Sequence, residues 1–527
     1  MNDSVASVRH GCITAPGAEK ESRPRSLPRQ SMIQRRARAR AAFIGFIALL
    51  SPTLSVFGQG PSESPPVPLK VITLRPSAEP VPALRYRFFP EQRELIPGNA
   101  AIFYHRAIEF LLQKRALDQS KGGNTDAKIY EWINLPIRDL PREDVRKTLD
   151  IFRSVLKEVE LGTRREFCNW EFDRRDEGFD LLLQDIQEAR SLGRLVVLQT
   201  RFEIVEGRID HALHWLKTGF VFSRHAGQGT SLVQALIGMA IERSVMGGLE
   251  DLIQAPGTPS LCWALAVLPR PLIPLGPPLE GERYMLERQL PGLRELDSDP
   301  WSLEKAQAFS DAIQRSANMF VGLWAAVAKD SDQPSMGNWG RRLLMTSLIA
   351  RTYPAAKRHL VAEGRPIARV EAMPVIQAVA LYSLKAYEQM RDDIYKWTLI
   401  PYPQAYAGMQ EAMQRKGQRI RNDKQGLPFG ETLPAFLAVF VASVRSERQV
   451  AAFQAIEAIR LYAGSHGGQL PPSLEAIKEA PVLPDPATGK SFEYKVDGTS
   501  AKLSSLPIPG QGVAAYSVLN YELRIMK

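Results

Sequence analysis

Cysteine is scarce in this chain, with three among 527 residues. Cys12 lies in the basic N-terminal segment, so Cys168 and Cys262 are the two thiols of the remaining chain. A framework of several disulfides is therefore excluded, and at most one bridge can form. Cys262 lies in the apolar run Leu261–Leu265, which favours two separate buried thiols, although a bridge stays open as the alternative.

Recognisable catalytic motifs are also absent. No serine lies between glycines at a strand-to-helix turn, neither cysteine has a nucleophile signature, and no phosphate-binding loop or dinucleotide fingerprint is present. Gly227-Gln228-Gly229 follows a predicted helix instead of a strand, so it is read as a helix stop. Paired carboxylates such as Asp392 and Asp393 are typical of solvated helix faces. We therefore expect no cofactor.

The positive charge is concentrated at the front of the chain. The formal net charge is +10, but residues 1–58 hold nine Lys/Arg against three Asp/Glu, which leaves +4 for the rest. Binding to phosphates along a nucleic acid needs a basic stripe with interleaved aromatic residues, and no such stripe is visible in the rest of the chain. We therefore expect no nucleic-acid partner.

The N-terminus is typical of a secretory signal. The basic segment Arg35–Arg40 precedes the apolar run Ala41–Leu50, and small residues follow up to Gly58. Met32 would begin a signal of ordinary length. The apolar run reaches about 17 residues at most, the lower limit for crossing a bilayer. We predict a signal peptide over 1–58 and export to the periplasm or cell envelope, with membrane attachment only if the signal stays uncleaved.

Composition divides the remaining chain into four parts. Seven prolines between Gly60 and Pro82 predict an extended, disordered tether over 59–83, because proline disfavours helices and interior strands. The alternation of Leu84–Phe88 predicts a short strand. The other boundaries are set by proline clusters and loop-like composition, and they give a helical-hairpin domain at 84–278, a second helical block at 279–432, and a long helix with a β tail at 433–527.

Helical periodicity is clearest between residues 194 and 253. A helix is predicted over Leu195–Val205, a tight turn over Glu206–Asp210, a second helix over Ala212–Arg224, and a third from Leu232. This pattern resembles a tetratricopeptide-like hairpin, but no steady repeat of about 34 residues is found. We therefore predict stacked helical hairpins that offer a concave surface, and not a regular repeat array.

The remaining segments complete the predicted fold class. Spacing of apolar residues predicts helices over 100–117, 303–328, 341–363, 375–397 and 434–462. At the tail, Phe492–Val496 alternates, Asp497-Gly498 is a hairpin turn signal, and Ala501 and Leu503 alternate back. The chain is thus predicted to be mainly α, with a small C-terminal antiparallel β element that residues 518–525 join.

Part of the tail resembles a known family. The segment Ala458–Tyr462 is followed by His466-Gly467-Gly468, then Leu470-Pro471, and then Asp485-Pro486 before the hairpin. This order resembles the C-terminal part of type II secretion pseudopilins over about 70 residues. In that family the helix begins the mature chain, whereas here it lies far downstream, so the resemblance does not imply filament assembly. The calcium site of some pseudopilins is not transferred, because only Asp485 matches.

The whole chain also resembles a family of exported bacterial proteins without an assigned activity. Those proteins share the order of signal, proline-rich tether, helical hairpins and pseudopilin-like tail. The resemblance implies export and architecture, and it implies no reaction.

One pair of residues is the best metal candidate in the chain. His211 and His214 are three residues apart, so a helix would present both on one side, and Glu206 or Asp210 could add an oxygen ligand. The zincin pattern needs histidines four apart with a glutamate beside the first, and neither requirement is met. The alternative interpretation is a pair of surface histidines.

Two functions from different classes follow from these observations. The favoured one is an exported scaffold or binding protein without catalytic activity, whose partner is a protein. The alternative is a periplasmic hydrolase with a metal or acid–base site around His211 and His214.

Overall fold

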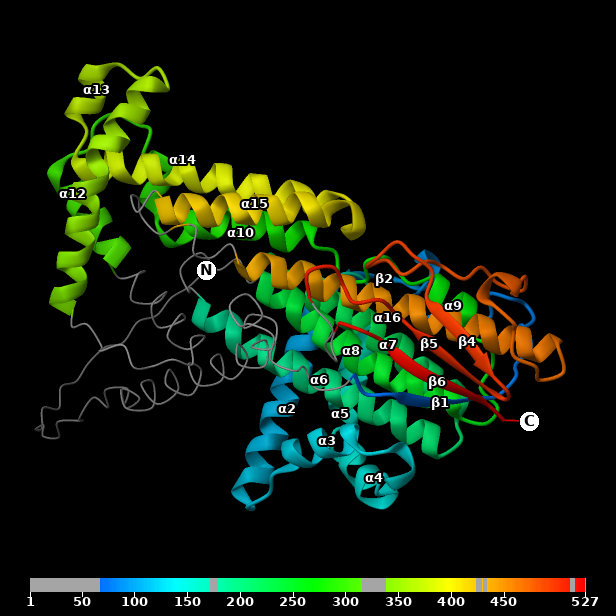
Figure 1. Cartoon of the computed structure of the whole chain (residues 1–527). Coiled ribbons are helices and arrows are strands. Elements are labelled where there is room, and N and C mark those ends of the chain that lie inside the picture. Colours follow the sequence, from blue (N-terminus) through cyan, green and yellow to red (C-terminus); the bar gives the residue numbers. More distant parts are fainter. Residues whose placement is uncertain are drawn as a thin grey trace, which may run out of the picture.

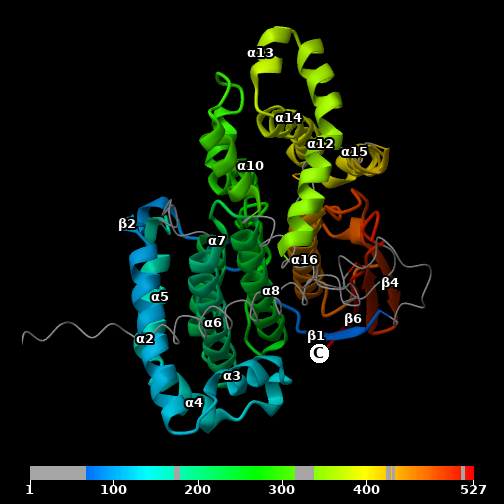
Figure 2. The ribbon, with the colours of Figure 1, turned by 90° about the vertical axis from the view of Figure 1, so that its left-hand side faces the viewer.

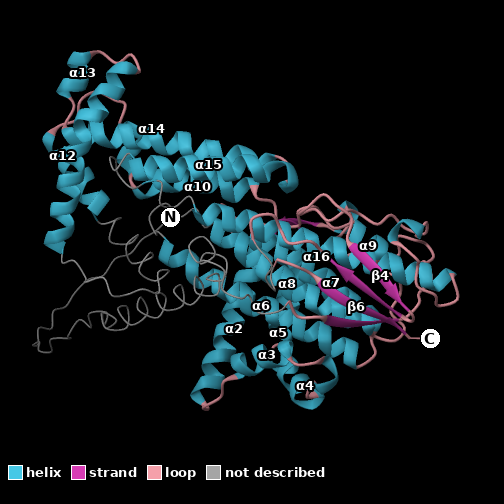
Figure 3. Ribbon diagram, in the orientation of Figure 1, coloured by secondary structure: helices cyan, strands magenta, loops and turns pink. Residues whose placement is uncertain are grey.

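The computed structural model describes residues 67–170, 179–314, 338–422, 429, 434–511 and 517–526. Within them the chain is mainly helical, and four strands near one end form a small sheet (Figures 1 and 3). The predicted class, mainly α with a small β element, is confirmed. The predicted signal peptide lies outside the described residues.

The first helices pack side by side into one body. Figure 2 shows α2, α5, α6, α7 and α8 standing next to one another, with α3 and α4 at one end. Their bounds are α2 Ala101–Ser120, α3 Thr125–Asn134, α4 Arg142–Ile151, α5 Arg153–Thr163, α6 Phe179–Val205, α7 Ile209–Gly227 and α8 Leu232–Gln254. Two short strands pair in parallel beside these helices: β2, Ile96–Asn99, precedes α2, and β3, Arg165–Phe167, follows α5. Their pairing holds the start of α2 next to the end of α5.

The predicted hairpin over residues 195–224 is confirmed. Gly207 adopts a φ of +70°, a conformation that a side chain disfavours, and it lets the chain reverse between α6 and α7. The turn is closed by the N–H of Arg208, which donates to the carbonyl of Glu203 at 2.9 Å. The next helix, α8, starts at Leu232 as predicted, and the Ser231 side chain caps it by accepting from the Gln234 N–H.

Glycines allow α7 and α8 to approach closely. A Cβ on Gly238 of α8 would lie 2.6 Å from the Cα of Gly227 and 2.7 Å from the carbonyl oxygen of Ser223, both on α7. Backbone atoms cannot move aside as a flexible side chain can. We therefore expect Gly238→Ala to lower the free energy of unfolding by about 1–3 kcal/mol through overpacking, measured by urea denaturation.

Gly247 on the same helix is the matched control. A Cβ there would meet nothing within 4 Å, so Gly247→Ala should raise stability by about 0.5–1 kcal/mol through helix propensity alone. Equal effects of the two substitutions would show that α7 and α8 are not in close contact.

Helix α8 is also long and apolar. Among the residues described, it alone is long and apolar enough to span a membrane by length and composition, and 67% of the relevant window is buried inside the protein. Its apolar surface is thus largely used in packing against α6, α7 and α16.

The second helical block forms an arm that extends from this body (Figure 1). The predicted helices at 341–363 and 375–397 are observed with small shifts, and the predicted helix at 303–328 is observed over 303–314, its remainder lying outside the described residues. The bounds are α10 Gly276–Gln289, α12 Asn338–Ala362, α13 Ile367–Ala372, α14 Val375–Tyr395 and α15 Tyr402–Asn422.

The tail consists of a long helix and the sheet. Helix α16, Pro434–Ser465, packs on α8 and on the short α9, Cys262–Ala266. The sheet has the order β1-β6-β5-β4, with β1 Lys70–Leu74, β4 Glu493–Asp497, β5 Ser500–Ser504 and β6 Asn520–Ile525. The predicted β4–β5 hairpin is confirmed, and Asp497 pairs with Ser500 across its two-residue loop.

Two expectations near the N-terminus are wrong. Residues Lys70–Leu74 lie in the predicted tether, yet they form β1, which pairs in parallel with β6 and makes the sheet mixed instead of purely antiparallel. Ile72 and Leu74 are fully buried, because the sheet covers the apolar side chains that an isolated tether would leave in water. Residues Leu84–Phe88 form an irregular loop and not a strand.

One hydrophobic core runs through all these parts. It extends from Ile72 in β1 through the helical body to Phe453 in α16 and Leu523 in β6. A smaller cluster around Tyr402 and Phe440 joins α15 to α16. Helix α16 is therefore the central element, since it contacts the body, the sheet and the arm.

Candidate functional site

The predicted metal pair lies on the surface of α7. His211 and His214 are both exposed, and the Nε2 of His214 lies 3.2 Å from Oε1 of Glu160 on α5. This hydrogen bond lowers the pKa of Glu160 despite its partial burial. Glu206, proposed as an oxygen ligand, is instead held by Arg146 at 3.1 Å.

Nothing in the described part of the chain gathers further ligands there. A search of the described residues finds no group of three or more His, Cys, Asp or Glu that could hold a metal ion. Structural and catalytic zinc sites need at least three protein ligands. His211 and His214 are both surface residues, and His214 shares a hydrogen bond with Glu160.

His214 and Asp210 nevertheless border a groove. Residues 84–94 fold over α7 and enclose, with it, a half-open cavity of about 300 Å³ that we call the α7 groove. Leu213, His214 and Lys217 line it from α7, and Tyr86 and Phe88 line it from the loop. The sequence singled out the α7 side of this groove and missed the loop, because nothing in the loop's composition shows where it folds.

Ion pairs stiffen the loop that covers the groove. Glu91 lies 2.8 Å from Arg87 and 2.6 Å from Arg93, while Glu94 accepts from Lys217 at 2.9 Å. Burial disfavours the charge on Glu94, but the hydrogen bonds from Lys217 and from the Glu91 N–H outweigh it, and the pKa of Glu94 falls below its usual value. Lys217 therefore ties the loop to α7 at neutral pH.

Two charged groups of the groove make no ion pair within the described part of the chain. The guanidinium of Arg85 lies over the Tyr86 ring at 5.4 Å, and no carboxylate contacts it. Asp210 is exposed in the first turn of α7. The groove thus combines apolar walls with one available cation and one available carboxylate, which suits binding and supplies no activated nucleophile.

A buried tyrosine–histidine pair lies elsewhere in the body. The hydroxyl of Tyr104 is 2.7 Å from Nδ1 of His225, and the indole N–H of Trp170 donates to the His225 carbonyl at 2.7 Å. Burial, with a smaller effect of Arg224, lowers the pKa of His225 to about 3. Burial also raises the pKa of Tyr104. Both groups stay neutral, and neither borders the α7 groove, so the pair serves packing.

The two cysteines are separate free thiols, as the favoured interpretation expected. Cys262 is fully buried and Cys168 is half-buried. Burial, with smaller effects of Glu457 and Glu79, raises the pKa of Cys262 to about 12, and burial raises that of Cys168 as well. Reactive cysteines have lowered pKa values, so neither thiol is an activated nucleophile.

Asp485, the residue shared with the pseudopilin pattern, is occupied by an arginine. Arg448 of α16 donates from Nε and Nη2 to the two carboxylate oxygens of Asp485, at 2.9 and 2.6 Å. Both side chains are 2% exposed, and Asp485 also accepts from the Ala487 N–H. A guanidinium thus balances this carboxylate, and the sequence did not single out Arg448 because an arginine on a helix is usually solvated.

Comparison with protein-family models, with curated proteins and with solved structures finds no match for this chain.

Proposed function

We propose that this chain is an exported helical binding protein, and that its α7 groove holds a segment of a partner protein. The observation that carries the proposal is the composition of the groove, in which Leu84, Tyr86 and Leu213 provide apolar walls beside the free charges of Arg85 and Asp210. A polypeptide segment has both apolar side chains and charges of both signs. Export is supported by the basic and apolar segments before Gly58.

The chemistry of the groove favours binding over hydrolysis. His214 is engaged by Glu160, the cysteines lie outside the groove, and the lining holds no serine or threonine. A hydrolase needs an activated nucleophile, a metal-bound water, or a water activated by a free general base. Glu91 and Glu94 are held in ion pairs, so Asp210 is the one unpaired carboxylate in the described lining, and it has no second acid–base group paired with it. The pairs Glu94–Lys217 and Glu91–Arg87 also hold the loop in place, and a preformed groove loses less entropy on binding.

Peptide selection with a charge-reversal variant tests the proposal. Peptides displayed on phage would be selected on the purified chain, and their affinity measured by fluorescence anisotropy. We expect the selected peptides to carry apolar residues flanked by a Lys or Arg that meets Asp210 and an Asp or Glu that meets Arg85. Asp210→Lys should weaken their binding at least about tenfold, equivalent to about 1.4 kcal/mol.

Asp144→Lys is the matched control. Asp144 is also an exposed aspartate in the first turn of a helix, α4, and it does not line the groove. Unchanged binding in Asp210→Lys, or equal losses in both variants, would contradict the groove as the site. Stoichiometric zinc that is lost on His211→Ala would favour the hydrolase instead, and chain recovered from the cytosol with residues 1–58 attached would contradict export.

A further inference from the structure

The charge of the folded chain is distributed unevenly. Residues 338–422, which form α12–α15, contain fourteen Lys/Arg and six Asp/Glu, a net charge of +8. Residues 59–337 and 423–527 together contain 44 Lys/Arg and 48 Asp/Glu, a net charge of −4. The weak overall charge of +4 after residue 58 therefore conceals a strongly basic arm, whose potential attracts anions.

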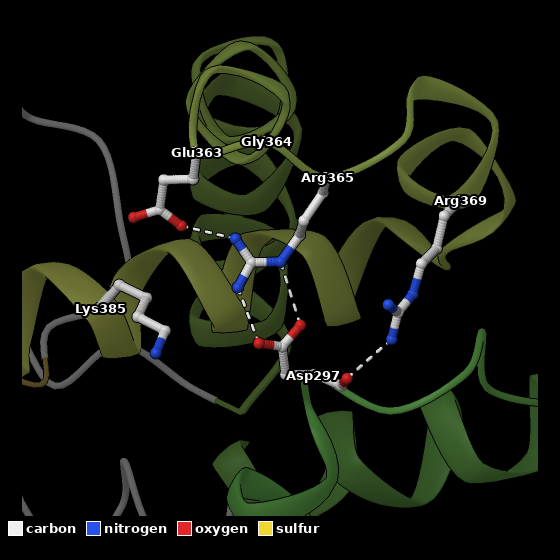
Figure 4. A pocket seen from close by; sticks show the side chains of 6 residues that line it. All are labelled: Asp297, Glu363, Gly364, Arg365, Arg369 and Lys385. Atoms are coloured by element: carbon white, nitrogen blue, oxygen red, sulfur yellow. Dashed lines mark hydrogen bonds and ion pairs between the residues drawn. The ribbon is translucent and has the colours of Figure 1, made fainter.

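A charged pocket lies at the end of this arm. Its volume is about 490 Å³, and it opens widely to solvent. Asp297 enters it from the segment after the 3-10 turn Pro291–Glu295, and Lys385 enters it from α14 (Figure 4). Glu363, Gly364, Arg365 and Arg369 enter it from the end of α12 and from α13. We call this the arm pocket.

The guanidinium of Arg365 lines the arm pocket and donates hydrogen bonds to two carboxylates. Its Nε and Nη2 donate to the two carboxylate oxygens of Asp297 at 3.0 and 2.7 Å, and its Nη1 donates to Glu363 at 2.5 Å. The hydrogen bonds from Arg365 lower the pKa of Asp297, so that carboxylate stays charged. The three side chains together carry a net charge of −1, with their donors and acceptors directed at one another (Figure 4).

Lys385 and Arg369 are the two remaining charged residues of the arm pocket. Within the described residues, the ammonium of Lys385 has one ionic contact, at 3.8 Å from Glu388, and no hydrogen bond. Arg369 uses Nη2 on the carbonyls of Asp297 and Ser298, at 2.8 and 3.2 Å, and its Nε is buried, so a ligand in the pocket cannot reach it. Its Nη1 makes no hydrogen bond within the described residues and remains as its unused donor group. Two cations with unused donors thus face one open pocket whose lining has a net charge of +1.

The rim of the arm pocket is open at Gly364. This residue follows α12 with a φ of +94°, and a Cβ at this position would meet nothing within 4 Å. No side chain of residue 364 therefore covers the pocket at this point of its rim.

We propose that the arm pocket binds a phosphate-like dianion through Lys385 and Arg369. A guanidinium and an ammonium are the two side-chain groups that bind phosphate oxygens best, and two cations with unused donors match a doubly charged ligand. The basic arm would raise the local concentration of such anions. The phosphate belongs either to a free molecule or to a lipid headgroup, and both present the same oxygens. This site is separate from the α7 groove, so neither proposal depends on the other.

A titration with matched lysine variants tests the arm pocket. Inorganic phosphate would be titrated into the purified chain at constant ionic strength and followed by calorimetry, and sedimentation with phosphatidylglycerol vesicles would be compared with phosphatidylcholine vesicles. Lys385→Met should weaken binding at least about tenfold, with an unchanged melting temperature because Lys385 makes no hydrogen bond that the fold needs.

Lys357→Met is the control, since it removes the same charge from the same arm. Lys357 pairs with Glu371 at 2.7 Å and does not line the pocket. Loss of phosphate binding in Lys385→Met alone supports a site for free phosphate, and the same selective loss with vesicles alone supports a lipid headgroup. Equal losses in both variants would assign binding to the overall charge of the arm and overturn the proposal, as would no binding of either probe.

Discussion

Replacing Arg460 with methionine should lower the free energy of unfolding by about 3–5 kcal/mol, the usual effect of leaving one charge of a buried pair without its partner. Arg460 and Glu457 on α16 are both fully buried, with Nη1 at 2.5 Å from Oε1. Arg460 also donates to the carbonyls of Arg75 and Thr258, at 3.1 and 3.0 Å. The substitution would therefore leave the Glu457 charge without its cation, held among the described residues only by the Leu261 N–H at 2.6 Å, and two carbonyls without a donor where three segments of the chain meet.

The chain contains a matched control for this pair. Asp150 and Arg153 have the same spacing of three residues and a contact of 2.5 Å, but their side chains are 55% and 80% exposed. Arg153→Met should change stability by at most about 0.5 kcal/mol, since exposed pairs contribute little. Unfolding in urea, followed by circular dichroism at 222 nm, measures both variants.

A double variant separates charge from packing. If the orphaned charge of Glu457 causes the loss, Glu457→Gln together with Arg460→Met should be less destabilised than Arg460→Met alone. No unpaired ion remains in the double variant, and the glutamine oxygen can still accept from the Leu261 N–H. An effect of Arg460→Met as small as that of Arg153→Met would show that the α16 pair is open to water.

Replacing Glu242 with glutamine should stabilise the protein at pH 8 by up to about 3 kcal/mol, which corresponds to a pKa difference of about 2.5. Glu242 of α8 is 1% exposed, and its Oε2 has no hydrogen-bond partner. Its pKa is raised from 4.5 to about 7, because burial and, to a smaller extent, the neighbouring Glu447 disfavour the charged form more than the hydrogen bond with Ser446 favours it. The charge of Arg270 partly offsets the effect of burial, which raises the pKa of Glu447.

The direction of the pH dependence follows from these two pKa values. Between pH 4.5 and 7 the folded chain keeps the Glu242 proton while the unfolded chain releases it, so stability falls as the pH rises through this window and then levels off above pH 7. Glutamine cannot ionise, so Glu242→Gln should lack this decline and match the wild type near pH 4.5.

Thermal unfolding at pH 4.5 and pH 8 measures this effect. Glu143→Gln serves as the control, because the Glu143 side chain is 70% exposed and its substitution should change stability by less than about 0.5 kcal/mol at either pH. A Glu242→Gln variant that is less stable than the wild type at pH 8 would mean that a cation stabilises the carboxylate in the folded chain.

Much of the helical framework could be predicted because its signals are local. The α6–α7 hairpin followed from apolar spacing and from Gly207, and the β4–β5 hairpin followed from alternation around Asp497-Gly498. These patterns depend on neighbours a few residues apart, for which backbone conformation and amphipathic spacing are decisive. The candidate site was found in part for the same reason, since Asp210 and His214 lie on one helix.

Long-range pairing could not be predicted in the same way. Strand β1 pairs with β6 across about 450 residues, from Lys70 to Tyr521, and the prolines on both sides of it suggested a tether. Arg448 looked like an ordinary solvated arginine in the sequence, but α16 is covered by the body on one side and by the sheet and its turns on the other. The loop over the α7 groove also depends on a distant contact, between Glu94 and Lys217.

The sequence by itself determined that the chain is mainly helical, where the α6–α7 hairpin and the tail reverse, and that no disulfide framework or known catalytic motif is present. The tertiary structure decided which charges lie in water and which are buried, because the burial of a side chain depends on what packs over it. It likewise decided that Lys385 and Arg369 face one pocket and that Asp210 faces another. Periodicity assigns a residue to one face of its own helix, and only the packing of distant segments determines what that face contacts.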